Sequence, residues 1–181
     1  MRLLKCSEEG RRRNTTLEIL SIQPFLQYYS RLRERTLKVV DCIPPEAIDW
    51  TYAPGKFSFG DILRHVAAIE RYMYAENVQL KPSRYPGHGK ILADGYDATM
   101  RFFRDTHRES MVIFGSLTDE QLKGECVTPA GARIAVWKWL RTLTEHEIHH
   151  RGQLYIYLGT LGIATPPLYG LSSEEVQARS R

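Results

Sequence analysis

The chain has 181 residues, of which 43% are hydrophobic and 25% are charged, and its formal net charge is +4. This length and apolar share suffice for one domain with one continuous core. The positive excess is too small to indicate a polyanionic partner, and much of it lies near the ends of the chain, in Arg11, Arg12, Arg13, Arg179 and Arg181. We therefore do not expect nucleic acid as a partner.

Cysteine usage and hydropathy indicate the compartment. Cys6, Cys42 and Cys126 lie far apart and form no CxxC or CxxH pair. They encode neither a disulfide framework nor a zinc ribbon, which favours a reducing cytoplasmic location. The apolar segment over residues 17–29 is interrupted by charged and amide residues and by a proline, so we expect no signal peptide and no membrane span.

Apolar residues at helical spacing predict four long helices. We expect them over about residues 16–40, 59–80, 92–117 and 135–161. Pro24 allows a kink or a late start in the first helix, and the Ser58 hydroxyl is well placed to cap the second. The connection between the second and third helices is rich in proline and glycine and long enough to cross the bundle.

Two shorter features separate the third and fourth helices. Residues 118–121 predict one extra helical turn, and residues 125–133 predict a short loop or hairpin. Without credible strands between the long helices, the fold class is all-α, a four-helix bundle over residues 16–170. We expect a loosely ordered basic tail over residues 1–15 and a tail or short helix over residues 171–181.

Three histidines lie on the apolar faces of the second and fourth expected helices. With about 100° per residue and His146 at the origin, His150 falls at about 40°, inside the apolar stripe, and His149 at about −60°, outside it. His65 lies at the margin of the apolar face of the second helix. Imidazoles that enter an apolar interior need a hydrogen-bond partner or a metal ion, and the i, i+4 spacing of His146 and His150 suits a single ion.

Other interpretations of these residues stay open. A single histidine on an apolar face is more often a satisfied core or surface residue than a ligand. The agreement of three imidazoles on two helices favours one divalent transition metal, with a coordination position left free. We treat His88, in a loop, and His107, on an expected solvent face, as ordinary residues.

Two segments carry a resemblance to a known family. The run HEIHHRGQ at residues 146–153, followed by Tyr155, Leu158 and the PPLY run at residues 166–169, resembles the closing segment of the DinB/YfiT-like superfamily. Residues 57–66 resemble the entry to the second helix of that family. The name refers to damage-inducible bacterial proteins and not to the translesion polymerase that shares it.

The resemblance implies a DinB/YfiT-like four-helix bundle with a long crossover between helices two and three, often assembled as a homodimer. It implies one divalent metal held by a histidine of the second helix and an HxxxH pair of the fourth. Transferred to this sequence, the ligands are His65, His146 and His150, the same three that the periodicity selects. Zinc or nickel is expected first, with iron, manganese and copper as further candidates.

The resemblance further implies a metal-dependent transferase or hydrolase that acts with a small thiol on an electrophilic small molecule. The alternative is a non-catalytic metal-binding or dimer-forming stress-response protein, and a nucleic-acid-associated factor is the third class. Cys6, Cys42 and Cys126 lie in places that do not suit a nucleophile, so a substrate thiol is the better nucleophile.

Several polar residues near the expected ligands have more than one interpretation. Glu147 is the candidate catalytic base or acceptor near the metal, although an ion pair with Arg64 or another basic group fits equally well. Asp61 suits either the orientation of His65 or the start of its helix. Arg151 and Gln153 flank the ligands, and each could pair with a helix or with an acidic substrate.

Overall fold

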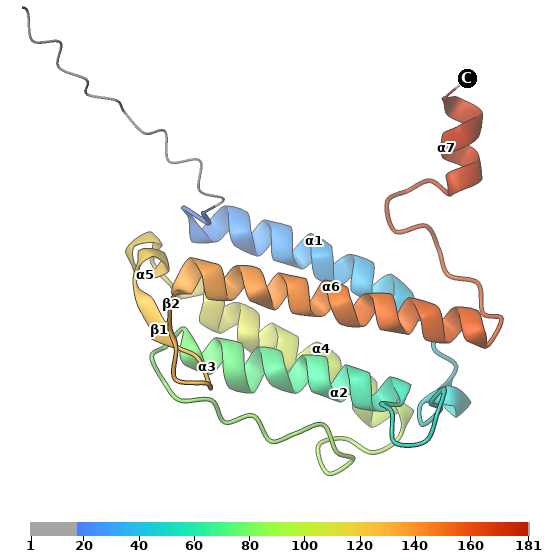
Figure 1. Cartoon of the computed structure of the whole chain (residues 1–181), viewed down its shortest axis with the longest axis horizontal. Helices are drawn as coiled ribbons and strands as arrows, with labels where there is room; N and C mark the ends of the chain where they lie inside the picture. The colour runs from blue at the N-terminus through green and yellow to red at the C-terminus, as the bar shows by residue number, and fades with distance from the viewer. Residues whose placement is uncertain (1–17, 181) are drawn as a thin grey trace, which may run out of the picture.

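The computed structural model describes residues 18–180, and within them four long helical segments form an all-α bundle (Figure 1). The expected basic tail over residues 1–15 lies outside the described residues. The segments are α1 (Ile22–Val40), a continuous helix made of α2 (Phe59–Ile69), η2 (Glu70–Tyr74) and α3 (Ala75–Asn77), then α4 (Tyr96–Gly115) and α6 (Val136–Thr160). The predicted fold class is confirmed.

The shorter elements join these segments. The 3-10 turn η1 (Pro45–Ala47) follows α1, and α5 (Asp119–Lys123) follows α4. Strands β1 (Glu125–Val127) and β2 (Arg133–Ala135) form an antiparallel hairpin that leads into α6. The helix α7 (Ser173–Arg179) stands apart from the bundle, and none of its residues is buried (Figure 1).

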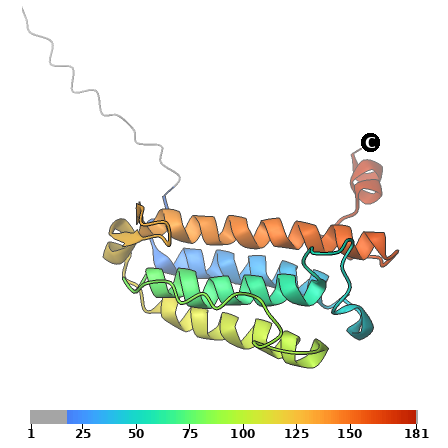
Figure 2. The same cartoon turned by 60° about the horizontal axis from the view of Figure 1, so that its bottom comes forward.

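The chain crosses the bundle between α3 and α4. In Figures 1 and 2, α1 and α6 run in one direction, and α2 and α4 both run in the other. The connection over residues 78–95 therefore returns along the length of the bundle, as its length predicts. Helix α2 packs against α4 and α6, and α1 packs against the same two helices.

Several helices begin or end at other residues than the apolar periodicity predicts, because the backbone conformation sets their ends. Helix α1 begins at Ile22 and not near residue 16, with Pro24 in its first turn, where a missing N–H costs nothing. The second long helix ends at Asn77, shortly before Leu80, which has a positive φ of 62°. Helix α4 begins after Gly95, which has a φ of 76°.

The start of α2 is fixed by a capping box. The Ser58 hydroxyl accepts a hydrogen bond from the backbone N–H of Asp61 at 3.1 Å, and the Asp61 carboxylate accepts one from the backbone N–H of Ser58 at 3.0 Å. Both partners satisfy amides that the first helical turn leaves free. This box defines the phase of the helix that carries His65.

A layer of polar side chains crosses the middle of the bundle. Two apolar clusters fill the two ends of the bundle. The first includes Leu143 of α6 and Phe114 of α4, and the second includes Leu154 of α6 and Phe103 of α4. We call the residues between them the central polar layer: Arg33, Thr36, Glu70, Thr106, His107, Ser110, Thr144, His146, Glu147, His150 and Arg151. Buried polar groups need partners within the protein, so this layer is where the chain places its chemistry.

None of the helices in the described part of the chain is both long enough and apolar enough to cross a membrane.

Candidate metal centre

The three predicted ligand histidines converge in the structure. His65 comes from α2, and His146 and His150 come from successive turns of α6. The Nε2 atom of His146 lies 3.1 Å from Nε2 of His65 and 3.1 Å from Nε2 of His150. One nitrogen of each ring lies within 4.8 Å of the other two, so the group can hold a single metal ion.

The remaining ring nitrogens of two of these histidines are held by neighbouring side chains. The Nδ1 atom of His65 lies 2.8 Å from the hydroxyl of Tyr85, and Nδ1 of His150 lies 2.7 Å from Oε1 of Gln153. An amide oxygen only accepts, so Nδ1 of His150 donates and its Nε2 carries a lone pair. Such partners fix the tautomer and the ring orientation of metal-binding histidines.

The rings are held neutral by their surroundings. Burial, followed by repulsion from His150 and His88, lowers the pKa of His65 to about 4. Burial, followed by repulsion from His150, His65 and His149, lowers the pKa of His146 to about 3. Burial also lowers the pKa of His150, although its hydrogen bond with Gln153 acts in the opposite direction. Neutral imidazole is the form that binds a metal.

The donor set fits a divalent transition ion. A neutral imidazole has one N–H, so the ring of His146 cannot donate to both His65 and His150, and its Nδ1 atom is buried without a partner among the described residues. Nitrogens at neighbouring tetrahedral positions around one ion lie about 3.3 Å apart, close to the 3.1 Å found for two of the three nitrogen pairs. Three imidazoles suit zinc, nickel, copper or iron and leave a position open.

A cleft of about 680 Å³ opens beside His150, which is the one member of the histidine group among its lining residues. The other lining residues come from the loop before α2 and from the last turns of α6: Tyr52, Gly55, Lys56, Phe57, Gln153, Ile156, Tyr157 and Thr160. Its volume lies in the range of small-molecule sites. A small molecule in this cleft would therefore lie next to His150.

The crossover segment between α3 and α4 is held over the second helix by Arg64. The buried guanidinium of Arg64 donates from Nε to the carbonyl of His88 at 2.7 Å and from Nη1 to the carbonyl of Ala93 at 3.1 Å. These bonds hold the segment that delivers Tyr85 to His65. Arg64 therefore serves the loop and the capping carboxylate of Asp61, at 2.7 Å, and does not pair with Glu147.

Glu147 takes part in a buried ionic network on the other side of α6. Its carboxylate lies 2.9 Å from the guanidinium of Arg33, which also pairs with Glu70, and Nδ1 of His107 lies 2.8 Å from Glu70. Both Glu147 oxygens are buried without a hydrogen-bond partner of good geometry among the described residues. The ion pair predicted with a basic group is thus formed with Arg33, and a catalytic role of Glu147 stays a prediction.

Glu70 and Arg33 keep their charges despite burial. Burial acts to raise the pKa of Glu70, but attraction to Arg33 and His107 outweighs it and holds that pKa below its usual value. Burial acts to lower the pKa of Arg33, and attraction to Glu147 and Glu70 raises it above its usual value. The π-helical turn η2 begins at Glu70, and such turns often occur near functional sites.

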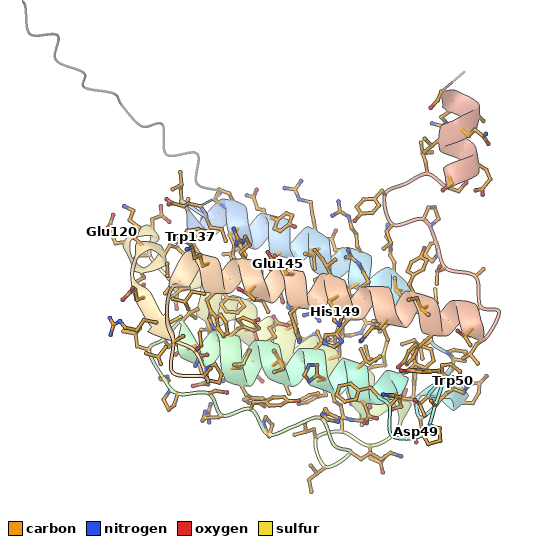
Figure 3. The ribbon with its side chains drawn as sticks, in the orientation of Figure 1. Asp49, Trp50, Glu120, Trp137, Glu145 and His149 are labelled. Carbon is orange, nitrogen blue, oxygen red and sulfur yellow. The ribbon has the colours of Figure 1, made fainter. Side chains whose placement is uncertain are left out.

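Other predicted residues are now placed. Asp61 caps its helix and binds Arg64, and its carboxylate forms no hydrogen bond with His65. Arg151 donates to the carbonyl of Leu32 in α1 at 3.4 Å. His149 is exposed, as is Glu145 one turn earlier on α6 (Figure 3), and it does not join the ligand group. His107 was expected on a solvent face, but its side chain is only 14% exposed because it faces Glu70.

The described cysteines are poor nucleophiles. Burial, followed by the nearby charge of Asp41, raises the pKa of Cys42, and burial raises the pKa of Cys126, which is only 1% exposed. A raised pKa keeps a thiol protonated and unreactive at neutral pH. Cys6 lies outside the described residues.

Fold and site together define a helical bundle that carries three convergent histidines on two of its helices. A family model described as the DinB superfamily matches residues 28–154, which is more than half of the chain. The chain therefore belongs to the DinB superfamily, as the resemblance of residues 146–153 predicts.

Two curated proteins resemble the chain over much of its length. The protein YjoA of Bacillus subtilis is 27% identical over 125 residues, which cover 66% of this chain and 79% of YjoA. A beta-hexosaminidase of Vibrio cholerae is 24% identical over 84% of this chain, which spans 56% of that protein's length.

Solved structures share the fold. A DinB-like protein of Bacillus cereus superposes with a TM-score of 0.68 at 21% identity, over 82% of this chain and 97% of that protein. YfiT of Bacillus subtilis, described as a probable metal-dependent hydrolase with an unusual four-helix bundle topology, superposes with a TM-score of 0.62 at 16% identity, over 89% of this chain and 95% of YfiT.

Proposed function

We propose that the chain binds one divalent transition metal through His65, His146 and His150 and acts as a metal-dependent hydrolase or thiol transferase on a small electrophilic molecule. The observation that carries this proposal is the convergence of three neutral imidazoles, one of which, His150, lines a cleft of about 680 Å³. The description of YfiT as a probable metal-dependent hydrolase supports the same class.

The chain's own residues supply binding and orientation. Gln153 and Tyr85 hold the rings of His150 and His65, and the cleft lined by Gln153 and His150 admits a small molecule next to the site. When bound, a divalent ion supplies positive charge that lowers the pKa of a coordinated water or thiol. Because the described cysteines are buried or have raised pKa values, a thiol nucleophile would come from the substrate side.

Hydrolysis and thiol transfer differ in the nucleophile that attacks the substrate. A hydrolase uses water, and a transferase uses a low-molecular-weight thiol. We retain both, together with a homodimeric assembly and a cytoplasmic location, as predictions. Zinc and nickel remain the first metals to test, because both accept imidazole nitrogens.

The test begins with the metal content of the purified protein and of a variant with His65, His146 and His150 all changed to Ala. We expect about one equivalent of metal in the parent protein and none in the variant. Metal-loaded and chelated protein are then compared on chromogenic esters and, with added thiols, on chromogenic electrophiles. Activity that depends on the metal supports the enzyme, whereas one bound equivalent without turnover on either panel supports the non-catalytic alternative.

A further inference from the structure

We propose that the cleft beside His150 binds a small molecule with a flat apolar body and a single carboxylate, and that Lys56 contacts the carboxylate. This inference names a class of substrate for the proposed function, and to that extent it rests on the proposed function. The binding preference itself depends on the walls of the cleft, which we call the Lys56 cleft.

The walls of the Lys56 cleft are mainly apolar and include three aromatic side chains. Tyr52 and Phe57 come from the loop before α2, and Tyr157 and Ile156 come from α6. The rings of Tyr52 and Tyr157 have centroids 5.5 Å apart in an edge-to-face arrangement. The Tyr157 hydroxyl donates to the carbonyl of Phe57 at 3.0 Å, so the two walls are tied together. Aromatic walls with fixed positions favour a flat apolar ligand.

The Lys56 cleft carries one uncompensated positive charge. Lys56 is the only Lys, Arg, Asp or Glu side chain among its lining residues, and it forms no ion pair within the described part of the chain. The carboxylates closest in sequence are already paired, since Asp49 binds Lys90 at 2.6 Å and Asp61 binds Arg64 at 2.7 Å. An anionic group entering this cleft therefore meets attraction without a competing acid on its walls.

The number of donors limits the charge of the ligand. A phosphate is usually bound by several donors, such as an arginine fork or a helix N-terminus, and the Lys56 cleft has neither among its lining residues. One ammonium group on a flexible stem matches a monoanion such as a carboxylate. With Lys56 at the carboxylate, the rest of the molecule lies along the aromatic walls, and His150 lines the same cleft.

The test compares 2-naphthylacetate with its neutral amide, 2-naphthylacetamide, in titrations of the metal-loaded protein followed by NMR. We expect the acid to bind about two- to fivefold more tightly than the amide, the ratio expected of one exposed ion pair. Lys56→Arg should keep this preference, Lys56→Met should abolish it without weakening the amide, and Lys56→Glu should reverse it. Tyr52→Ala should weaken both ligands by a similar factor.

The control variant is Lys138→Met, which removes an exposed lysine of α6 that does not line the cleft and should change neither affinity. Persistence of the acid preference in Lys56→Met, or failure of both ligands to bind, overturns the proposal. The same titrations on metal-free protein separate it from the proposed function. Acid selectivity through Lys56 in the metal-free protein supports the cleft by itself, so a failure of the metal-dependent reaction in the activity assays would refute the proposed function and leave the cleft proposal standing.

Discussion

At the scale of single residues, the hydrogen bond between Gln153 and His150 orients one of the three candidate ligands. The amide oxygen accepts from Nδ1 at 2.7 Å, which directs Nε2 toward His146. Gln153→Ala should lower metal affinity by about 10- to 100-fold, the range found for such outer partners. Gln153→Glu keeps an acceptor at the same place and serves as the matched variant. Competition with a metal-binding dye measures both, and equal affinity of parent and Gln153→Ala would contradict this role.

The neighbouring histidines His149 and His150 provide a second residue-scale prediction. His149 is exposed and lies outside the ligand group, whereas His150 is buried and inside it. His149→Ala should leave the metal stoichiometry unchanged, and His150→Ala should lower it. Elemental analysis of the two purified variants measures their metal content. Loss of metal on His149→Ala alone would show that the assigned ligand set is wrong.

At the scale of the elements, Arg33 joins three helical segments through one guanidinium. It pairs with Glu70 of η2 and Glu147 of α6 from its position on α1, and all three side chains are at most 3% exposed. Arg33→Met leaves two buried carboxylates without their cation and should lower the free energy of unfolding by about 3–5 kcal/mol. Urea denaturation measures the change.

Arg104 offers the matched control for this network. It pairs with Asp41 on the surface, where its side chain is 41% exposed, and Arg104→Met should change the free energy of unfolding by about 1 kcal/mol or less. Similar losses for the Arg33 and Arg104 variants would show that the buried network does not stabilise the bundle.

The sequence predicts the ligands because each lies on a regular helix with a readable apolar face. His146 and His150 lie one turn apart, and the angle of about 100° per residue separates them from His149 without any tertiary information. Tyr85 could not be found in this way, since it lies in an irregular connection whose path depends on the bonds of Arg64 to loop carbonyls. Local periodicity carries no information on which helix such a loop covers.

The parts that Glu70 and His107 play in the buried network were missed for a related reason. The helical periodicity assumes a constant angle per residue, but the π-helical turn η2 starts at Glu70 and changes the phase of the helix from there on. His107 was assigned to solvent because its partner Glu70 belongs to a different helix. A useful signal was present, because Glu70 follows Val66 by one turn on the apolar side, and an acid in that place calls for a buried cationic partner.

At the scale of the whole molecule, the stability of the metal-free protein should depend on pH through the histidine cluster. The usual histidine pKa of 6.5 is lowered to about 4 in His65 and about 3 in His146. At a pH between the usual pKa and the lowered pKa values, the unfolded chain binds more protons than the folded one. The free energy of unfolding therefore falls as the pH drops from about 6.5 toward 4 and 3. Urea denaturation of chelated protein at pH 7 and pH 5 measures this loss.

The control for the pH dependence is a variant with His65, His146 and His150 all changed to Gln. It should lose less stability than the parent between pH 7 and pH 5, because most carboxyl groups remain ionised in that interval. Equal losses in the two proteins would mean that other groups control the response to acid.

The central claim is that one metal ion binds to three histidines and keeps a position open toward the Lys56 cleft. The most direct test is a crystal structure of the metal-loaded protein with anomalous scattering data at the absorption edge of the metal. We expect one anomalous peak about 2.0–2.2 Å from a nitrogen of His65, His146 and His150, with a water or small molecule as the remaining ligand on the cleft side. A peak elsewhere, no peak, or a fourth protein side chain that closes the coordination sphere would contradict the claim.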